Sequence, residues 1–168
     1  PMVAEAVAKY VREDVPELEA VARVTFSDPA TFLVEGEPFR IETALANTEL
    51  FEIFDFKFAY GDAESIEQRP GALVLMESVA KRIFGDENPV GRSVQFGEAS
   101  IAIAAVIQDP PQPSHFGTTD QAIRSFEALQ VIPAASEDPQ EWWLGVTSFA
   151  YVLLPEENTD AAERSLNA

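Results

Sequence analysis

Cysteine is absent from this chain of 168 residues. A disulfide, a thiol nucleophile and a cysteine metal site are therefore excluded. Histidine occurs once, as His115, whereas a zinc site needs about three or four His, Cys or carboxylate ligands. We therefore expect no catalytic residue that depends on a metal, no metal site and no cofactor.

Basic residues are scarce. The chain holds 11 Lys and Arg against 29 Asp and Glu, which gives a formal net charge of −18. Such a surface repels phosphate, so nucleic acid is excluded as a partner, and an anionic lipid surface is disfavoured for the same reason. Two interpretations of the acidity remain open. It keeps the protein soluble, or it is an adaptation to high salt, where screening removes the self-repulsion of the carboxylates.

Long hydrophobic runs are also missing, since no segment approaches the roughly 18 apolar residues that span a bilayer. The start of the chain shows no signal peptide. The hydrophobic fraction is 46% and includes 12 Phe, which is enough to fill a sizeable core. The length suits one domain, or two small lobes that share a core.

Periodicity and turn residues predict alternating short strands and helices, which indicate an α+β (mixed α/β) domain. A hairpin is expected around residues 35–38 because these are turn-forming residues. Strands are expected at residues 19–26, 31–34, 39–46, 57–60, 73–76, 94–96, 99–108, 129–132 and 147–154. Helices are expected at residues 2–14, at residues 50–54 with Asn47, Thr48 or Glu49 as the cap, at residues 79–84 and at residues 120–129.

Residues 74–92 form the most informative stretch, which reads as strand, helix, turn and strand. Glu77 or Ser78 is expected to cap the helix by accepting from its free N–H groups. Gly85 is expected to end the helix in a left-handed conformation, and Asn88 followed by Pro89 prevents its continuation. The unit carries no reactive group, so it is predicted to be a packing unit.

These residues resemble the MacB-type periplasmic core domain of permeases in the FtsX-like ABC transporter family, in the form common in Bacteroidetes. The resemblance extends, in the family's order, over residues 15–20, 50–62, 106–116 and 142–155. The chain positions that match the family's motifs as structural residues are Phe51, Phe54, Phe56, Gly61, Phe84, Gly85, Asn88, Pro89, Gly91, Asp109, His115 and Phe116. Residues 26–36 match poorly, and residues 117–120 depart from the family's usual aromatic or aspartate content.

The resemblance implies one extracytoplasmic domain over residues 1–168 with two lobes, one an α/β lobe formed by the chain ends and the other a β-rich inserted lobe. It implies a place in the periplasm, between the first and second transmembrane helices of an inner-membrane permease. The implied function is non-catalytic: the domain couples ATP hydrolysis in the cytoplasm to the handling of a substrate or partner outside the membrane by mechanotransmission. The implied partners are a cytoplasmic ATPase subunit, reached through the membrane helices, a second permease copy, and a periplasmic partner or substrate.

Two groups of residues resemble reactive or ligand-binding sites but have simpler interpretations. Asp109, Ser114 and His115 share one proline-rich loop and suggest a hydrolase triad, but no nucleophile elbow is present and turn chemistry explains them better. Asp86, Glu87 and Asn88 lack the spacing of a calcium loop, so a polar turn after a helix is the better interpretation. No glycine-rich phosphate loop occurs, so the chain is not expected to hydrolyse nucleotide.

Aromatic residues supply the candidate binding surface. Trp142 and Trp143 are a candidate partner surface because tryptophan is enriched at interfaces, and adjacent residues of a strand point to opposite faces. Phe51, Phe54, Phe56 and Phe58 are interpreted as core filling, with an exposed apolar patch as the alternative. The rival hypothesis for the whole chain is an independent acidic secreted module for binding or scaffolding.

Overall fold

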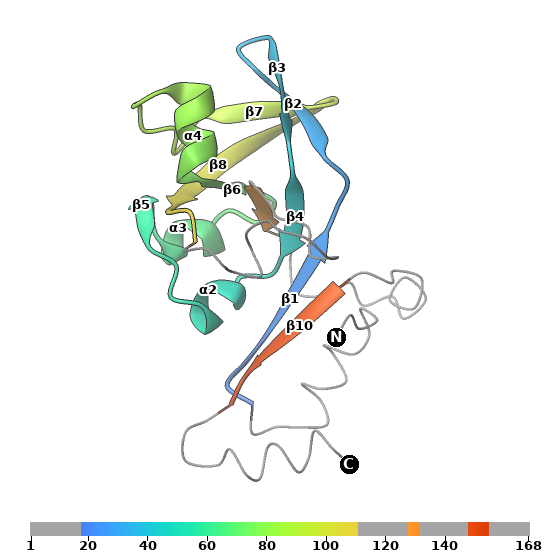
Figure 1. The fold of residues 1–168 in the computed structure, drawn as a ribbon, viewed down its shortest axis with the longest axis vertical. Helices are drawn as coiled ribbons and strands as arrows, with labels where there is room; N and C mark the ends of the chain where they lie inside the picture. Colours follow the sequence, from blue (N-terminus) through green and yellow to red (C-terminus); the bar gives the residue numbers. More distant parts are fainter. Residues whose placement is uncertain (1–17, 111–127, 132–147, 155–168) are drawn as a thin grey trace. The chain divides into compact units, whose positions relative to one another are not determined.

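The computed structural model describes residues 18–110, 128–131 and 148–154 (Figure 1). The strands of this part are β1 (Ala20–Phe26), β2 (Ala30–Val34), β3 (Glu37–Ile41), β4 (Thr43–Ala46), β5 (Phe58–Tyr60), β6 (Leu73–Met76), β7 (Ser93–Phe96), β8 (Ala99–Ile107), β9 (Ala128–Val131) and β10 (Ser148–Leu153). Its helices are α2 (Leu50–Ile53), α3 (Ala63–Glu67) and α4 (Glu77–Phe84). The helix predicted at residues 2–14 lies outside the described residues, as does most of the one predicted at 120–129. The two residues of the latter that are described, Ala128 and Leu129, lie in β9 instead.

The chain divides into two compact units. Unit 1 is formed by Pro1–Thr25, Ala46–Asp55 and Pro133–Ala168, and therefore holds both chain ends. Unit 2 is formed by Phe26–Leu45 and Phe56–Ile132, and is inserted into unit 1. The predicted α+β fold with a lobe from the chain ends and an inserted β-rich lobe is confirmed.

In unit 1, β1 and β10 form an antiparallel ladder that runs from Ala20 opposite Leu153 to Thr25 opposite Ser148. Helix α2 packs against β10, and the Phe54 ring meets the Tyr151 ring edge-on at 5.0 Å between centroids. Burial raises the pKa of the Tyr151 phenol above its ordinary value. The first and last described strands of the chain are thus joined to each other directly.

Asn47 ties the segment before α2 to β1, which corrects the predicted capping role. The buried Asn47 side chain accepts from the Arg23 backbone N–H at 2.7 Å and donates through its Nδ2 to the Val21 carbonyl at 3.1 Å. The N-cap residue of α2 is Glu49, whose side chain makes no capping bond. A local cap was expected because Asn favours helix starts, but this amide satisfies backbone groups of a strand instead.

In unit 2 the strands follow one another in the order β4-β9-β6-β8-β7-β2-β3, and β5 pairs with β8. β6 is parallel to β8 and antiparallel to β9, and all four of its residues are buried. A continuous apolar run is what a strand covered on both faces requires. β8 was expected to be the central buried strand, and its residues Ile103–Ile107 are fully buried, whereas Ala99 and Ser100 are exposed.

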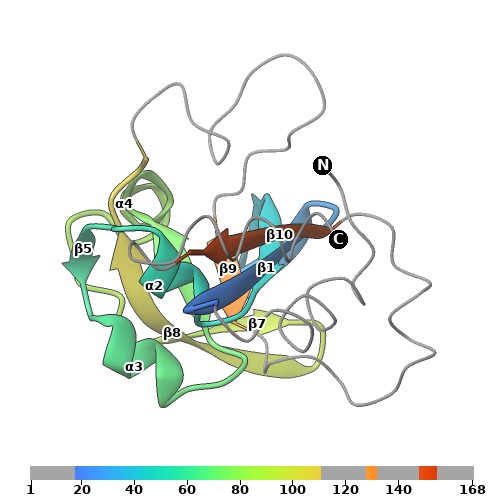
Figure 2. The ribbon, with the colours of Figure 1, turned by 90° about the horizontal axis from the view of Figure 1, so that it is seen from below.

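Helices α3 and α4 pack on this sheet. α4 lies against β6 and β8, and α3 lies against β8, as Figures 1 and 2 show. The apolar stripe of α4 faces the sheet through Val79 and Ala80, both buried. The predicted helix and its buried face are confirmed, and α3 is a helix that the sequence pattern did not indicate. No helix of the described residues is long and apolar enough to cross a membrane.

The β2–β3 hairpin turns at Glu35 and Gly36, whose φ angles are 53° and 89°. Positive φ at both central residues defines the type I′ turn that suits the twist of a hairpin. The hairpin prediction is confirmed, but the single strand predicted at 39–46 is two strands, since β3 ends at Ile41 and β4 begins at Thr43. Pro38 is tolerated because β3 is the edge strand of this sheet order.

Gly61 follows β5 at a point where the backbone of β8 is very close. Its φ is +76°, and a Cβ added there would lie 2.7 Å from the Ala104 carbonyl oxygen and 3.1 Å from the Ala105 Cα. Both groups belong to a buried strand and have no room to shift. Only glycine fits both the conformation and the space.

We expect Gly61→Ala to destabilise the chain by about 2–4 kcal/mol, because it combines left-handed backbone strain with a clash against backbone. Gly71→Ala is the matched control, since Gly71 has φ of +84° with nothing within 4 Å of the added Cβ. Its cost should be roughly 1 kcal/mol. Urea unfolding of both variants measures the difference, and equal losses would contradict the close approach to β8.

Candidate functional site

The residues that match the family's motifs fall in several places, and the described ones do not converge on one site. Phe51 and Phe54 lie in and just after α2, Phe56 and Gly61 flank β5, Phe84 and Gly85 end α4, Asn88, Pro89 and Gly91 form the loop before β7, and Asp109 follows β8. Trp142, Trp143, His115 and Phe116 lie outside the described residues, so the partner surface predicted at the tryptophans stays a prediction.

The aromatic group of residues 51–58 is neither a buried core nor a fully exposed patch. Phe51, Phe54, Phe56 and Phe58 are each partly exposed, and the buried residue of α2 is Leu50. The core-filling prediction is therefore met only in part, since these side chains are partly buried and the Phe54 ring packs on Tyr151.

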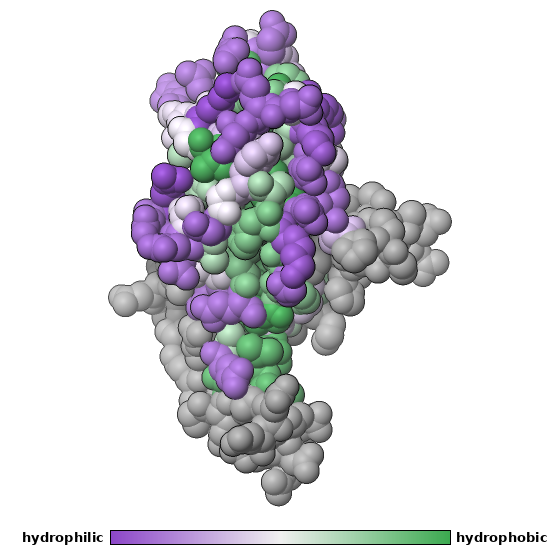
Figure 3. All heavy atoms as spheres, turned by 90° about the vertical axis from the view of Figure 1, so that its left-hand side faces the viewer, coloured by the Kyte–Doolittle hydropathy of each residue, from purple (hydrophilic) through white to green (hydrophobic). Residues whose placement is uncertain are grey.

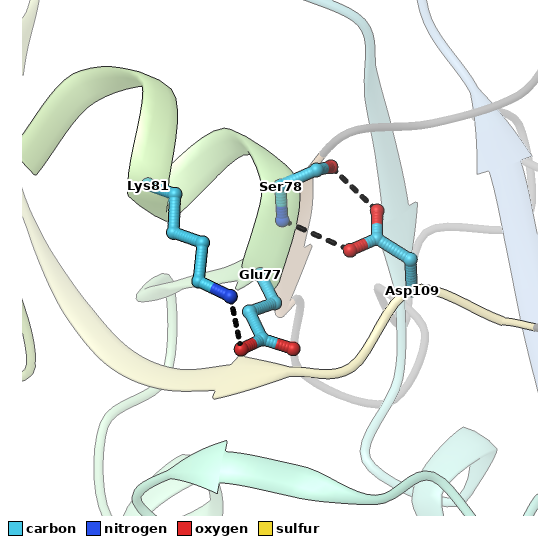
Figure 4. A network of polar contacts seen from close by, with 4 residues as sticks. All are labelled: Glu77, Ser78, Lys81 and Asp109. Atoms are coloured by element: carbon cyan, nitrogen blue, oxygen red, sulfur yellow. Dashed lines mark hydrogen bonds and ion pairs between the residues drawn. The ribbon is translucent and has the colours of Figure 1, made fainter. Parts of the chain in front are cut away.

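The start of α4 is held by a carboxylate from a distant part of the chain. Asp109 accepts from the Ser78 backbone N–H at 2.9 Å and from the Ser78 hydroxyl at 2.5 Å (Figure 4). The N-cap residue itself is Met76, which has no side-chain acceptor. The predicted cap by Glu77 or Ser78 is wrong, because both residues lie inside the first turn and Ser78 is a donor rather than an acceptor.

The same helix is stabilised along its exposed face. Glu77 and Lys81 form an i, i+4 ion pair at 2.8 Å, with the carboxylate nearer the helix start (Figure 4). This order suits the helix dipole, as does the placement of Lys81 and Arg82 in the last turn. The hydrogen bond from Lys81 to Glu77 raises the pKa of the ammonium group above its usual value.

The loop after α4 is a network of turns, as its polar residues predicted. The Asn88 side chain accepts from the Val90 N–H at 3.0 Å, which closes an Asx turn around the buried Pro89. Arg92 pairs with Glu87 and lies 5.5 Å over the Phe84 ring. The described residues contain no group of three or more His, Cys, Asp or Glu side chains arranged to hold a metal ion.

A hydrolase arrangement gains no support from the described part of the chain. Asp109 is engaged with Ser78, as a helix cap. Ser114 and His115 lie outside the described residues. Asp109 therefore has a structural role, but at the start of α4, 31 residues away, rather than in the local turn that the sequence predicted.

An aromatic row that the sequence did not single out crosses the other end of the unit 2 sheet. Phe39 lies opposite Phe32 in the β2–β3 register, and the Phe32 and Phe96 rings are 5.2 Å apart. Phe32 is buried, Phe39 is partly exposed and Phe96 is 47% exposed. The alternation of apolar residues on each strand indicated that these side chains share a face. The pairing of β2 with β7, which brings Phe96 next to Phe32, could not be deduced from one sequence. We call these three residues the aromatic row.

We expect Asp109→Ala to destabilise the chain by about 1–2 kcal/mol, because two donors at the start of α4 lose their acceptor. Ser78→Ala removes only the hydroxyl bond and should cost about 0.5 kcal/mol. Urea unfolding gives both values, and hydrogen exchange at the Ser78 amide should accelerate in the first variant alone. A Ser78→Ala loss as large as that of Asp109→Ala would contradict the cap.

We expect Asp62 to titrate below the ordinary carboxyl value of 3.8, since the hydroxyl and backbone N–H of Ser65 donate to it at the start of α3. A folded pKa below the unfolded one means that ionised Asp62 stabilises the fold above pH 3.8, and that this contribution is lost as pH falls through the folded pKa. A carboxyl NMR titration measures the shift. Ser65→Ala should move the Asp62 pKa back toward 3.8, and an unchanged value would refute the assigned cause.

Comparison with known proteins gives the chain a family. A family model described as the MacB-like periplasmic core domain matches residues 1–168. No match was found among curated protein sequences.

Solved structures with the same fold include domains of three transporter proteins. A domain of a permease protein from Porphyromonas gingivalis matches with a TM-score of 0.74 and 22% identity over 99% of this chain and 76% of that one. The periplasmic region of MacB from Actinobacillus actinomycetemcomitans matches with a TM-score of 0.68 and 19% identity, over 99% and 72% of the two chains. The extracellular domain of the noncanonic ABC-type transporter YknZ from Gram-positive bacteria matches with 0.60 and 12%, over 96% and 78%.

Proposed function

The chain belongs to the MacB-like periplasmic core domain family of ABC transporter permeases, and we propose that it transmits force from those permeases to a partner outside the membrane. In this proposal the domain performs no catalysis. ATP hydrolysis in the cytoplasm moves membrane helices, and the domain moves with them and displaces a substrate or a partner protein. Its working parts are surfaces and stiff connections rather than a reactive constellation.

The observation that carries the proposal is the β1–β10 ladder. The described strand nearest the start of the chain pairs over six residue positions with the described strand nearest its end. Backbone hydrogen bonds across an antiparallel ladder make two strands move together. A displacement delivered at either chain end is therefore passed to both, and from them to the rest of unit 1. The buried Asn47 amide extends this connection from β1 to the segment that leads into α2.

The proposed setting follows the family. The domain lies on the periplasmic side of the inner membrane, between the first two membrane helices of its permease, and residues 1–168 act as one domain there. A cytoplasmic ATPase subunit drives it through those helices, and a second permease copy stands beside it. The high acidity keeps such domains apart at ordinary salt, because like charges oppose self-association.

A hydropathy profile of the complete reading frame separates this proposal from its rival. One apolar segment of about twenty residues before residue 1 and three after residue 168 support the permease. A cleavable signal and no later span would instead support an independent acidic secreted module.

We expect the periplasmic domains of two permease copies to change their separation during the ATP cycle. A spin label at Ser100→Cys reports this in the full-length permease bound to its ATPase, with any cysteines elsewhere replaced. Ser100 is exposed in β8, and this chain has no cysteine that would take the label. Pulsed electron paramagnetic resonance should give different distance distributions with and without ATP.

Two controls test whether a change in distance comes from ATP-driven motion of the whole domain. A label at Glu19→Cys, exposed just before β1, should report the same transition from unit 1. An ATPase variant that binds ATP without hydrolysing it should hold one of the two distributions. If both labels keep one distribution through the whole cycle, the domain does not transmit motion and the proposal fails.

A further inference from the structure

We propose that the aromatic row of unit 2 is a docking surface for a partner protein segment that carries arginine or lysine side chains. The row was defined above as Phe39, Phe32 and Phe96. The inference deepens the proposed function by naming the surface and the chemistry of the partner. The biological role of the docking surface rests on the proposed function. The binding of the partner segment does not, because it needs no ATP.

The first argument is the exposure of the row. In the described part of the chain the large hydrophobic side chains that are exposed are Leu33, Tyr60 and Phe96, and Phe96 is the most exposed of them at 47%. Its ring extends a row that begins at the half-exposed Phe39 and passes over the buried Phe32. Phe32 lies on β2, the strand between β7 and β3, and is itself buried. The row therefore offers the exposed parts of the Phe96 and Phe39 rings, and an aromatic ring is a group that a cation binds.

The second argument is the charge around the row. Because alternate residues of a strand share a face, Glu37 lies on the same face of β3 as Phe39. Glu98 follows Phe96 by two residues in the turn to β8. Both carboxylates are exposed, and neither has an ion-pair partner among the described residues. Polar side chains dominate this end of unit 2, at the top of Figure 3.

The cation of this hairpin lies on the opposite face. Arg40 stands one position from Phe39 in β3, so the alternation of the strand directs it to the other side of the sheet, opposite Thr31. On the side of the aromatic row the hairpin carries Glu37 and no cation, and Arg92, just before β7, is paired with Glu87. Such a face complements a guanidinium or ammonium group, which the carboxylates attract and the rings hold. It does not complement an acidic or purely apolar partner.

The position of the row within unit 2 also suits a contact. β3 is the last strand of the unit 2 sheet order, so its outer edge is not paired with another described strand. Pro38 removes one backbone donor from β3, so the edge is a poor template for an added strand. The partner is therefore held by side chains and not by backbone pairing.

The test uses a fluorescent synthetic peptide of alternating arginine and valine, titrated into the 168-residue chain at about 0.15 M salt, where long-range attraction is screened. A peptide with glutamate in place of arginine is the charge control, and one of alternating arginine and serine shows the role of apolar contacts. We expect the arginine–valine peptide to bind, to shift the ring resonances of Phe96, and to bind more tightly than the other two.

Variants then separate the row from the general acidity of the chain. Phe96→Ala should weaken binding by about 3- to 10-fold, and Glu98→Gln should weaken it and reduce its salt dependence. Leu33→Ala is the matched apolar control, since Leu33 is 37% exposed on the neighbouring strand position that faces away from Phe32. Glu67→Gln, exposed in α3, is the matched charge control. Both controls should leave the affinity unchanged.

Equal losses in all four variants would mean nonspecific attraction to the net charge and would overturn the proposal. So would an unchanged affinity in Phe96→Ala, or sedimentation showing that the row joins two copies of this chain. The result is separable from the proposed function. If the labelled domains move with ATP but the peptide does not bind the row, only the docking surface is wrong. If the peptide binds the row but the domains do not move, force transmission is wrong and the surface remains.

Discussion

The burial of β8 is the constraint on which the rest of unit 2 depends. Its first residues pair with β7, and its later residues pair with β6 on one side and β5 on the other. Ile103–Ile107 are without solvent contact, so every neighbour must approach closely. A glycine is required at position 61, just after β5, because the backbone there lies against Ala104 and Ala105 of β8. The helices α3 and α4 take their positions from the same strand.

Two side chains far from the segments they hold complete the packing. Asn47 satisfies backbone groups of β1 that lie 24 and 26 residues before it, and Asp109 satisfies the start of α4 from 31 residues away. A free backbone donor at such a place costs about 1–3 kcal/mol when it is buried. Asn47 thereby fixes the segment between β4 and α2, and Asp109 fixes the start of α4.

The elements that depend on local pattern were predictable from the sequence, and those that depend on long-range pairing were not. The apolar run of β6, the helical spacing of α4 and the hairpin around Glu35 and Gly36 are local signals, and each is present in the structure. The caps failed because the acceptor for α4 is Asp109, which no local rule indicates. The aromatic row was not predicted for the same reason. Phe96 comes to lie beside Phe32 only because β7 pairs with β2. The family resemblance supplied the two lobes, which composition alone did not reveal.

The register of the β1–β10 ladder gives the domain a directional mechanical response. Ala20 and Leu153 lie opposite each other at the same end of the ladder, which is the end where the chain enters β1 and leaves β10. A load that pulls these two points apart acts on one residue pair at a time and unzips the ladder stepwise, with only about 1 kcal/mol of net resistance per hydrogen bond. A load shared by both points strains no pair, because the strands travel together. The ladder is thus stiff toward a common motion of the two chain segments that leave it at this end, and compliant toward their separation.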